Sequence, residues 1–377
     1  MAKLKVLIDV YYFKSALSGI RTYILELKIA AEKYGSENIE YVFSHDLNKL
    51  SNKHFFLNSK YKLIRWLFHL KYLIWKQLIL PFKLLWYKPD YLICPDYVSP
   101  IFSFNTRKLT VIHDSMFWDH SVDYNLIWRK YFTTLIELGI NHKTHIITTS
   151  NYSKATLKLV INKSNLIDVV YQSFERNLEE SIKLNNGIQL PEKYIFHIGS
   201  FEKRKDLITL VKAFHLIKKN GANKKLKLIL AGAKVFNGNH YVLNEINKYI
   251  LNNNLENEIL LLDYINKELA DFYFKNAFIY AFPSFNEGFG IPIIEAFSYS
   301  LPIVCSDIPV FKEIGNEAVS FFEVKNFLSL SKKIQELIDS KIYRTELIDK
   351  GNNQLMKFSR KNFIQGFEDI IMNWDEK

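Results

Sequence analysis

The stretch from Ala281 to Pro309 reads AFPSFNEGFGIPIIEAFSYSLPIVCSDIP. It begins at the end of an apolar run, passes through a loop that contains Gly288 and Gly290, and enters an apolar segment with Pro292 near its start. Proline is tolerated in the first turn of a helix, because the N–H group that it lacks would have no partner there. The stretch therefore predicts a strand, a tight loop and a helix in direct succession.

Two glutamates flank the start of this expected helix, Glu287 in the loop and Glu295 within the helix. The free N–H groups and the positive dipole end of a helix N-terminus favour bound phosphate, whereas an ionised carboxylate accepts hydrogen bonds from sugar hydroxyls. Each glutamate alone is more simply explained as a solvated loop residue or as an acid stabilised by the helix dipole. Together, a phosphate site and two carboxylates favour a nucleotide sugar as the ligand.

Several residues of this stretch form one pattern: Glu287, Gly288, Phe289, Gly290, Pro292, Glu295, Ala296 and Pro302. The pattern resembles the signature of family 4 glycosyltransferases, which are retaining enzymes of the GT-B fold. The resemblance implies that Glu287 is catalytic and binds the hexose hydroxyls, that Glu295 binds the ribose hydroxyls, and that the loop from Gly288 to Gly290 also contacts the donor. The family usually has a glycine before the last proline, where this chain has Leu301, and that difference affects only the capping of the helix.

A second loop, GSFEKRKD over 199–206, follows a predicted strand at 194–198 and precedes a predicted helix at 207–217. Exposed basic residues are usually just solvated. This loop, however, resembles the diphosphate-binding loop of the same family, with Asp206 where the family usually has Asn. The resemblance implies that Arg204 and Lys205 hold the diphosphate and neutralise the charge on the leaving group, which makes Lys205 a candidate catalytic residue.

The N-terminal half offers further candidate contacts. A predicted strand at 5–10 leads to a loop in which Gly19 and Arg21 partly match the family's N-terminal glycine loop, although an ordinary tight turn is the alternative. A predicted strand at 109–112 ends in His113-Asp114, at the strand end where α/β sheets bind ligands. Such a histidine is usually structural, but the resemblance implies that His113 faces the donor sugar and is catalytic, with Asp114 and Ser150 as further candidates. We expect Ser150 to cap a helix over 150–160.

Predicted strands and helices alternate on both sides of a polar, Asn-rich segment at about 173–191. This pattern predicts an α/β protein with two Rossmann-like domains facing a cleft. The GT-B assignment rests on the resemblance, as does the expectation that a C-terminal helix crosses back to the first domain. We expect an N-terminal, acceptor-side domain at 1–180, a nucleotide-sugar-binding domain at 190–358, and a helix at 359–377 that packs on the first domain.

Residues 60–88 combine seven Lys or Arg and no acid with many Trp, Leu and Ile residues. Two interpretations stay open for this segment: a helix that lies on an anionic membrane surface, with Trp66 and Leu70 on its apolar face and Lys76 at the edge, or a core helix of the first domain. Pro81 is expected to break or kink the helix. The charge of residues 1–190 is +9, from 25 Lys and Arg against 16 Asp and Glu, which suggests an anionic partner. Nucleic acid is not expected, because no nucleic-acid-binding module surrounds the basic residues.

The sequence gives no support for a metal or a separate cofactor, because it contains no Asp-x-Asp. It also lacks the Gly-x-Gly-x-x-Gly of a dinucleotide-dependent oxidoreductase. The two cysteines have no metal-binding or redox spacing, so we expect a reduced, cytoplasmic protein, with peripheral contact at the cytoplasmic face of the inner membrane as the open alternative. We predict a retaining, metal-independent hexosyltransferase that acts on a glycan or lipid-linked acceptor in capsule, O-antigen or lipopolysaccharide assembly. The alternative is a non-catalytic GT-B scaffold protein of a polysaccharide assembly complex.

Overall fold

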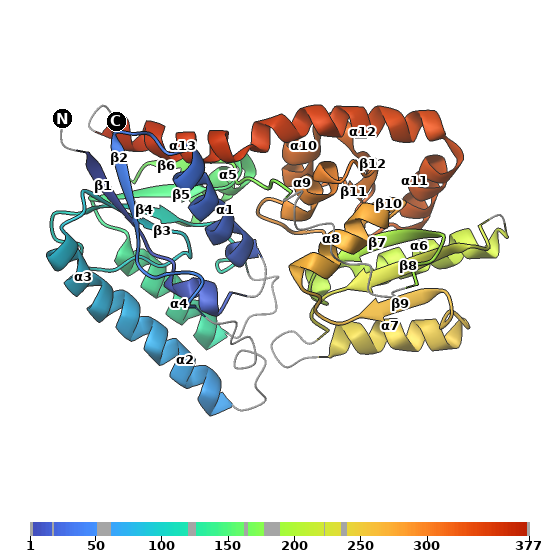
Figure 1. The fold of residues 1–377 in the computed structure, drawn as a ribbon. Coiled ribbons are helices and arrows are strands. Elements are labelled where there is room, and N and C mark those ends of the chain that lie inside the picture. Colours follow the sequence, from blue (N-terminus) through green and yellow to red (C-terminus); the bar gives the residue numbers. More distant parts are fainter. Residues whose placement is uncertain are drawn as a thin grey trace. The chain divides into compact units, whose positions relative to one another are not determined.

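The computed structural model describes residues 3–16, 19–50, 62–119, 126–161, 165–176, 189–221, 223–234 and 240–374, and of residues 62–65 only the backbone. The chain divides into two compact units, the first formed by Met1–Ser173 with Phe358–Lys377 and the second by Phe174–Lys357. Figure 1 shows the elements of each unit. The expected domain boundary at 180 lies outside the described residues.

The first unit is built on a six-stranded sheet in the order β2-β1-β3-β4-β5-β6. All of its pairings are parallel. Its strands are β1 (Leu4–Ile8), β2 (Ile39–Phe43), β3 (Tyr91–Cys94), β4 (Arg107–Val111), β5 (Thr144–Thr148) and β6 (Ile167–Val169). Both faces are covered: Val6 and Ile8 of β1 lie in one apolar cluster, and Leu7 between them lies in another. A parallel sheet needs such two-sided cover, which explains the continuous apolar runs in its strands.

Helices of the first unit cover these two faces. They are η1 (Tyr11–Lys14), α1 (Gly19–Tyr34), α2 (Lys62–Ile74), η3 (Trp75–Ile79), α3 (Leu80–Tyr87), α4 (Leu126–Gly139), α5 (Asn151–Val160) and α13 (Arg360–Met372). The last helix, α13, packs beside α1 and shares its apolar cluster. A buried ion pair also joins them, with 2.7 Å between Arg360 Nε and Glu26 Oε2. The C-terminal helix thus returns to the first unit, as predicted.

The segment from α2 to α3 is one helical run, and Pro81 does not break it. The preceding residues form a π turn, η3, in which the Leu80 N–H donates to the Trp75 carbonyl five residues back. A π turn widens the backbone, so it can accept the proline ring that would clash with the carbonyl of a regular α-helix. Of the expected break or kink at Pro81, the break was therefore wrong, and the kink stays a prediction.

Lys76 does not lie at the edge of an apolar face, as the sequence suggested, but is fully buried. Its Nζ lies 2.7 Å from Asp9 Oδ2 and 2.6 Å from Asp96 Oδ1. The two acids stand just after β1 and β3, so the helix places a cation between two neighbouring strand ends. Such a buried charge is tolerated only when it is paired. One face of this helix therefore belongs to the core.

The second unit contains another six-stranded parallel sheet, in the order β12-β11-β10-β7-β8-β9. Its strands are β7 (Lys193–Ile198), β8 (Leu226–Ala231), β9 (Ile259–Leu262), β10 (Ile279–Phe282), β11 (Ile303–Ser306) and β12 (Ser320–Phe322). Its helices are η5 (Lys203–Lys205), α6 (Leu207–Lys219), α7 (Tyr241–Asn252), α8 (Lys267–Asn276), α9 (Ile291–Ser298), α10 (Pro309–Gly315), η6 (Asn316–Ala318), α11 (Phe327–Asp339), α12 (Lys341–Leu355) and, at its end, η7 (Met356–Phe358).

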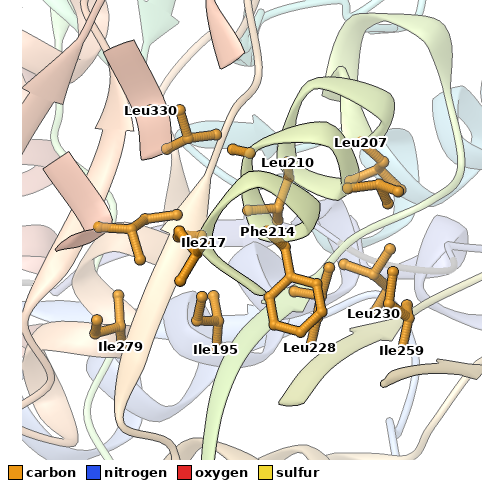
Figure 2. Packing of buried hydrophobic residues seen from close by; sticks show 14 of the residues in the cluster. Ile195, Leu207, Leu210, Phe214, Ile217, Leu228, Leu230, Ile259, Ile279 and Leu330 are labelled. Carbon is orange, nitrogen blue, oxygen red and sulfur yellow. The ribbon is translucent and has the colours of Figure 1, made fainter. Parts of the chain in front are cut away.

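The core of the second unit lies between α6 and the sheet. Figure 2 shows Leu210, Phe214 and Ile217 of α6 against Ile195 of β7 and Leu228 of β8. Those α6 positions are three or four residues apart, so they share one face of the helix. Packing along this face fixes the start of α6, and with it the loop after β7. The predicted α/β architecture of two Rossmann-like domains is confirmed.

Candidate functional site

Strand order places two loops at one point of the second sheet. The chain proceeds from β7 to β8 and β9 on one side and from β10 to β11 and β12 on the other, so β7 and β10 are neighbours at the point of reversal. In open α/β sheets, ligands bind outside the carboxyl ends of the strands at such a switch point. The loops 199–206 and 283–290 follow these two strands directly. A backbone hydrogen bond joins the two loops, in which Phe285 N donates to the Arg204 carbonyl oxygen at 2.9 Å.

Three charged side chains from these loops meet. Glu287 Oε1 lies 2.8 Å from Arg204 Nη1 and 2.6 Å from Lys205 Nζ. Arg204 also pairs with Glu202, at 2.8 Å between Nε and Oε2. All these side chains are largely shielded from water, with Lys205 buried. The structure therefore joins three predicted site residues into one cluster and adds Glu202, which the sequence analysis did not single out.

The charges in this cluster are strongly coupled. Burial alone would raise the pKa of Glu287, but the charges of Arg204 and Lys205 outweigh it and lower the pKa to about 2. Burial lowers the pKa of Lys205, although the charge of Glu287 opposes that shift. At neutral pH the carboxylate is ionised and is held by two cations. In this state a single oxygen of Glu287, Oε1, is paired with both Arg204 and Lys205.

The backbone around Lys205 explains how it reaches the cluster. Lys205 ends a short 3-10 turn, and Asp206 then adopts a left-handed conformation with φ 48° and ψ 41° before α6 begins. Asp and Asn are the non-glycine residues that most readily adopt this conformation. The Asp206 found here therefore suits the backbone as well as the Asn that is usual in the family. Lys205 Nζ lies 5.0 Å from the centre of the Phe282 ring, at the end of β10.

The glycines of the central loop have different roles. Gly290 has φ 102°, and a Cβ there would lie 2.9 Å from Cε1 of Phe311. A larger residue is therefore excluded by both conformation and space. Gly290 stands directly before α9, whose first turn contains Pro292, as predicted. Phe289 is buried, and Gly288 completes the loop.

Glu295 lies on α9 and is partly buried. Burial raises the pKa of Tyr280, and the charges of Glu295 and Glu287 raise it further. Both carboxylates are thus close enough to the Tyr280 side chain, on β10, to influence it. This places Glu295 in the same part of the second unit as the charged cluster. Its contact with ribose stays a prediction.

His197 was missed by the sequence analysis. It lies on β7 and is fully buried, with Nδ1 2.9 Å from the Ala281 carbonyl oxygen. Nε2 has no hydrogen-bond partner in the described part of the chain, and it would lie 3.1 Å from a Cβ on Gly199. Burial lowers the pKa of His197 to about 4, so the ring is neutral at pH 7. A strand histidine carries no sequence signal that separates this position from ordinary core.

His113 is buried in the first unit at the end of β4. Its Nε2 lies 2.9 Å from the Pro95 carbonyl oxygen, and burial lowers its pKa to about 4. Since a carbonyl can only accept, Nε2 carries the proton and Nδ1 is an acceptor. The rings of Tyr23 and Tyr97 lie against the imidazole, with centroids 4.7 and 5.2 Å away. Its predicted role toward the sugar stays a prediction.

Other candidates of the first unit make local contacts. Ser150 caps α5 by accepting a bond from Ser153 N at 3.0 Å, as predicted. Asp114 Oδ1 accepts from Met116 N at 3.0 Å. Arg21 Nη1 donates to the Phe13 carbonyl oxygen at 3.0 Å, and the Arg21 guanidinium lies over the ring of Phe13. Gly19 begins α1. These contacts explain the local fold and leave ligand binding by these residues as a prediction.

Two further observations bear on cofactors. Among the described residues, no group of three or more His, Cys, Asp or Glu side chains is arranged to hold a metal ion. Cys94 and Cys305 are both free and buried, and burial raises the pKa of each thiol.

Comparison with known proteins gives a consistent result. Residues 179–354 match the family model described as glycosyl transferases group 1. The O-antigen chain mannosyltransferase RfbU of Salmonella typhimurium is 25% identical over 256 residues, which cover 66% of this chain and 64% of that protein. O-antigen chain mannosyltransferase B of Escherichia coli is 24% identical, over 68% of this chain and 68% of that protein. The chain thus spans about two thirds of the length of these relatives.

A solved structure shares the fold over nearly the whole chain. The Anabaena protein HepE, in complex with UDP and glucose, superposes with a TM-score of 0.68 at 14% identity, covering 99% of this chain and 100% of that one. At this identity the likeness concerns the fold.

Proposed function

Because residues 179–354 match the family model of the glycosyl transferases group 1, we propose that this chain is a retaining glycosyltransferase. In this proposal it moves a hexose from a nucleotide diphosphate sugar to a glycan or lipid-linked acceptor during the assembly of a cell-surface polysaccharide. The O-antigen relatives support that setting, and their description as mannosyltransferases makes mannose the first sugar to test.

One observation carries the proposal: Arg204, Lys205 and Glu287 meet at the switch point of the second sheet. A nucleoside diphosphate needs positive charge where its bond to the sugar breaks, and two largely shielded cations supply it without a metal. Arg204 presents a planar donor group, which suits phosphate oxygens. The ligand chemistry of this site is therefore that of a diphosphate next to hydroxyl groups.

In this proposal, donor binding changes the hydrogen-bond partners of Glu287. In the structure its carboxylate is paired with Arg204 and Lys205. A diphosphate that binds the two cations competes with the carboxylate for their N–H groups. The carboxylate is then free to accept hydrogen bonds from hexose hydroxyls. In this proposal, donor binding itself makes Glu287 available to the sugar.

The chemical step that we propose needs no protein nucleophile. The bond between the anomeric carbon and the phosphate oxygen breaks, and the acceptor oxygen forms a bond to the same face of that carbon. The acceptor's proton passes to the departing phosphate oxygen, whose charge Arg204 and Lys205 stabilise. His113 is proposed to flank the sugar, where its Nδ1 would accept a hydrogen bond from a hydroxyl group. Gly19, at the start of α1, is proposed to admit the phosphates.

A donor-hydrolysis assay tests the function. Purified protein is incubated with a panel of UDP- and GDP-hexoses, and free nucleotide is measured with and without EDTA. NMR of the sugar released at early times, or of a transfer product, reports the anomeric configuration. We expect turnover of at least one donor, unchanged by EDTA, with retained configuration. A folded protein that binds a donor but turns over none would indicate a scaffold instead.

The proposed acceptor places the enzyme at a membrane surface, at the cytoplasmic face of the inner membrane. Among the described residues, no helix is long and apolar enough to cross a bilayer.

A further inference from the structure

The helical run from α2 to α3 exposes a row of large apolar side chains. The row recurs at every fourth position, and the exposed fractions of its members are 60% for Trp66, 36% for Leu70, 38% for Ile74, 55% for Leu78, 70% for Phe82 and 86% for Trp86. We call these six residues the apolar row. Contiguous apolar surface of this kind marks an interaction site far more often than single exposed residues do.

The same helix is anchored by its opposite side. Tyr72, Trp75, Leu80 and Leu84 are buried against the sheet. Lys76, between them, is held by Asp9 and Asp96. From Tyr72 to Leu84 the exposure of the apolar row is therefore not the result of a loosely attached helix, because the opposite side of this part is buried in the core of the first unit. The helix presents the row on a fixed support.

The segment after β3 also exposes aromatic side chains. Ile101 N donates to Gln77 Oε1 at 3.0 Å, which holds the segment after β3 against the π turn. In that segment Phe102 is 69% exposed and Phe104 is 47% exposed. This segment therefore carries two exposed aromatic side chains within three residues of its contact with the π turn.

The charged residues of the segment that carries the apolar row have one sign. Residues 60–88 contain seven Lys or Arg and no acid. Lys71 is exposed on the helix, and Lys88 is exposed directly after its end. Aromatic side chains stand near both ends of the row, and Trp and Tyr favour the boundary between lipid headgroups and acyl chains. Two copies of this chain that met through the row would bring like charges together, whereas an anionic surface would be complementary to it.

We propose that the apolar row docks the protein on an anionic phospholipid bilayer, with the helix lying along the interface. The apolar side chains would enter the boundary of the acyl chains while the lysines remain at headgroup level. The proposed function enters this inference in one respect only: docking would bring the site to a lipid-linked acceptor. The docking itself follows from the apolar row and the basic charge.

Vesicle flotation tests the docking. The full-length protein is mixed with one of two kinds of vesicle. The neutral vesicles contain phosphatidylcholine alone, and in the anionic vesicles about one lipid in three is phosphatidylglycerol. We expect flotation with the anionic vesicles and a weaker signal at high salt. The double variant Phe82→Ser with Trp86→Ser should lower the partition coefficient about ten-fold or more, since two large apolar side chains leave the interface. Lys71→Glu should weaken binding to the anionic vesicles about five-fold or more.

A matched control replaces exposed apolar residues of the second unit, Ile342→Ser with Leu251→Ser, whose wild-type exposed fractions are 84% and 62%. We expect it to bind like the wild type. Absent flotation of the wild type, or equal losses in both double variants, overturns the proposal. The proposal is also overturned if the wild type is a dimer in analytical ultracentrifugation and the Phe82→Ser, Trp86→Ser variant is a monomer, because the row would then be an interface between copies.

Donor hydrolysis without vesicles separates the two proposals. It should be unchanged in the Phe82→Ser, Trp86→Ser variant, because neither residue is part of the cluster around Glu287. If the wild type floats with anionic vesicles but turns over no donor, the docking stands and the proposed function falls. If the wild type hydrolyses a donor but does not float with anionic vesicles, the proposed function stands and the docking falls.

Discussion

Replacing Glu287 with Gln tests the central ion pairs directly. The pKa of Glu287 falls from 4.5 to about 2 in the folded protein. At about 1.4 kcal/mol per pK unit, this shift corresponds to roughly 3 kcal/mol of folding free energy. The side chain is only 11% exposed, so solvent screens the interaction little. Burial also lowers the pKa of Lys205, which offsets part of the gain, so we expect Glu287→Gln to cost about 2–3 kcal/mol at pH 7.

The pH dependence gives this prediction its sign. The folded pKa lies below the unfolded one, so the unfolded chain binds more protons between pH 4.5 and about 2. The stabilisation by Glu287 is complete above pH 4.5 and is lost as the pH falls through about 2. The wild type should therefore lose its advantage over Glu287→Gln in that window. Below it, the two proteins should differ by less than about 0.5 kcal/mol.

Urea denaturation at several pH values measures the difference, and calorimetry shows whether the two units unfold together. Glu256→Gln, at an exposed position of the same unit, is the control and should change stability by less than about 0.5 kcal/mol. The reasoning fails if Glu287→Gln and the wild type are equally stable at pH 7. It also fails if a difference of that size persists unchanged at pH 2.

Three more predictions concern the same unit. Lys205→Met should lower kcat/KM for donor hydrolysis by about 10²–10³, while Lys203→Met, at the exposed start of the same turn, should leave it within a factor of about two; steady-state kinetics decide between them. Gly290→Ala should destabilise the protein by about 1–3 kcal/mol more than Gly221→Ala, because both have positive φ but only Gly290 lacks space for a Cβ; denaturation midpoints give the comparison. His197 is neutral when folded, so its contribution to stability should be present above pH 6.5 and lost as the pH falls through about 4; Tm measured over that range should fall less steeply in His197→Gln.

Much of the fold could be predicted because its determinants are local. The loops that contain Arg204 and Glu287 each follow a short apolar run and precede a helix, and that order alone places both loops at strand ends. The resemblance added which side chains to follow. The switch point could not be predicted from local pattern, since it depends on β10 pairing with β7 rather than with β9.

The partners of charged residues were the main gap. Lys76 looked like a surface lysine because its two acids, Asp9 and Asp96, are remote in the sequence and become neighbours only when β1 and β3 pair. Arg204 and Glu287 were expected to bind a ligand separately, yet they bind each other. Long-range ion pairs depend on tertiary geometry that local periodicity does not encode.

The π turn at Trp75–Ile79 sets the rotational phase of everything that follows it. Each residue of a regular helix advances the chain by about 100° around its axis. A π turn holds one residue more than an α-turn and absorbs it locally, so Leu84 stays buried and Phe82 stays exposed. The same extra residue within the regular helix would instead rotate everything after it by about 100°. The wide turn thus keeps the dry side and the wet side of one continuous rod aligned, and one residue added or lost outside the turn would disturb that alignment.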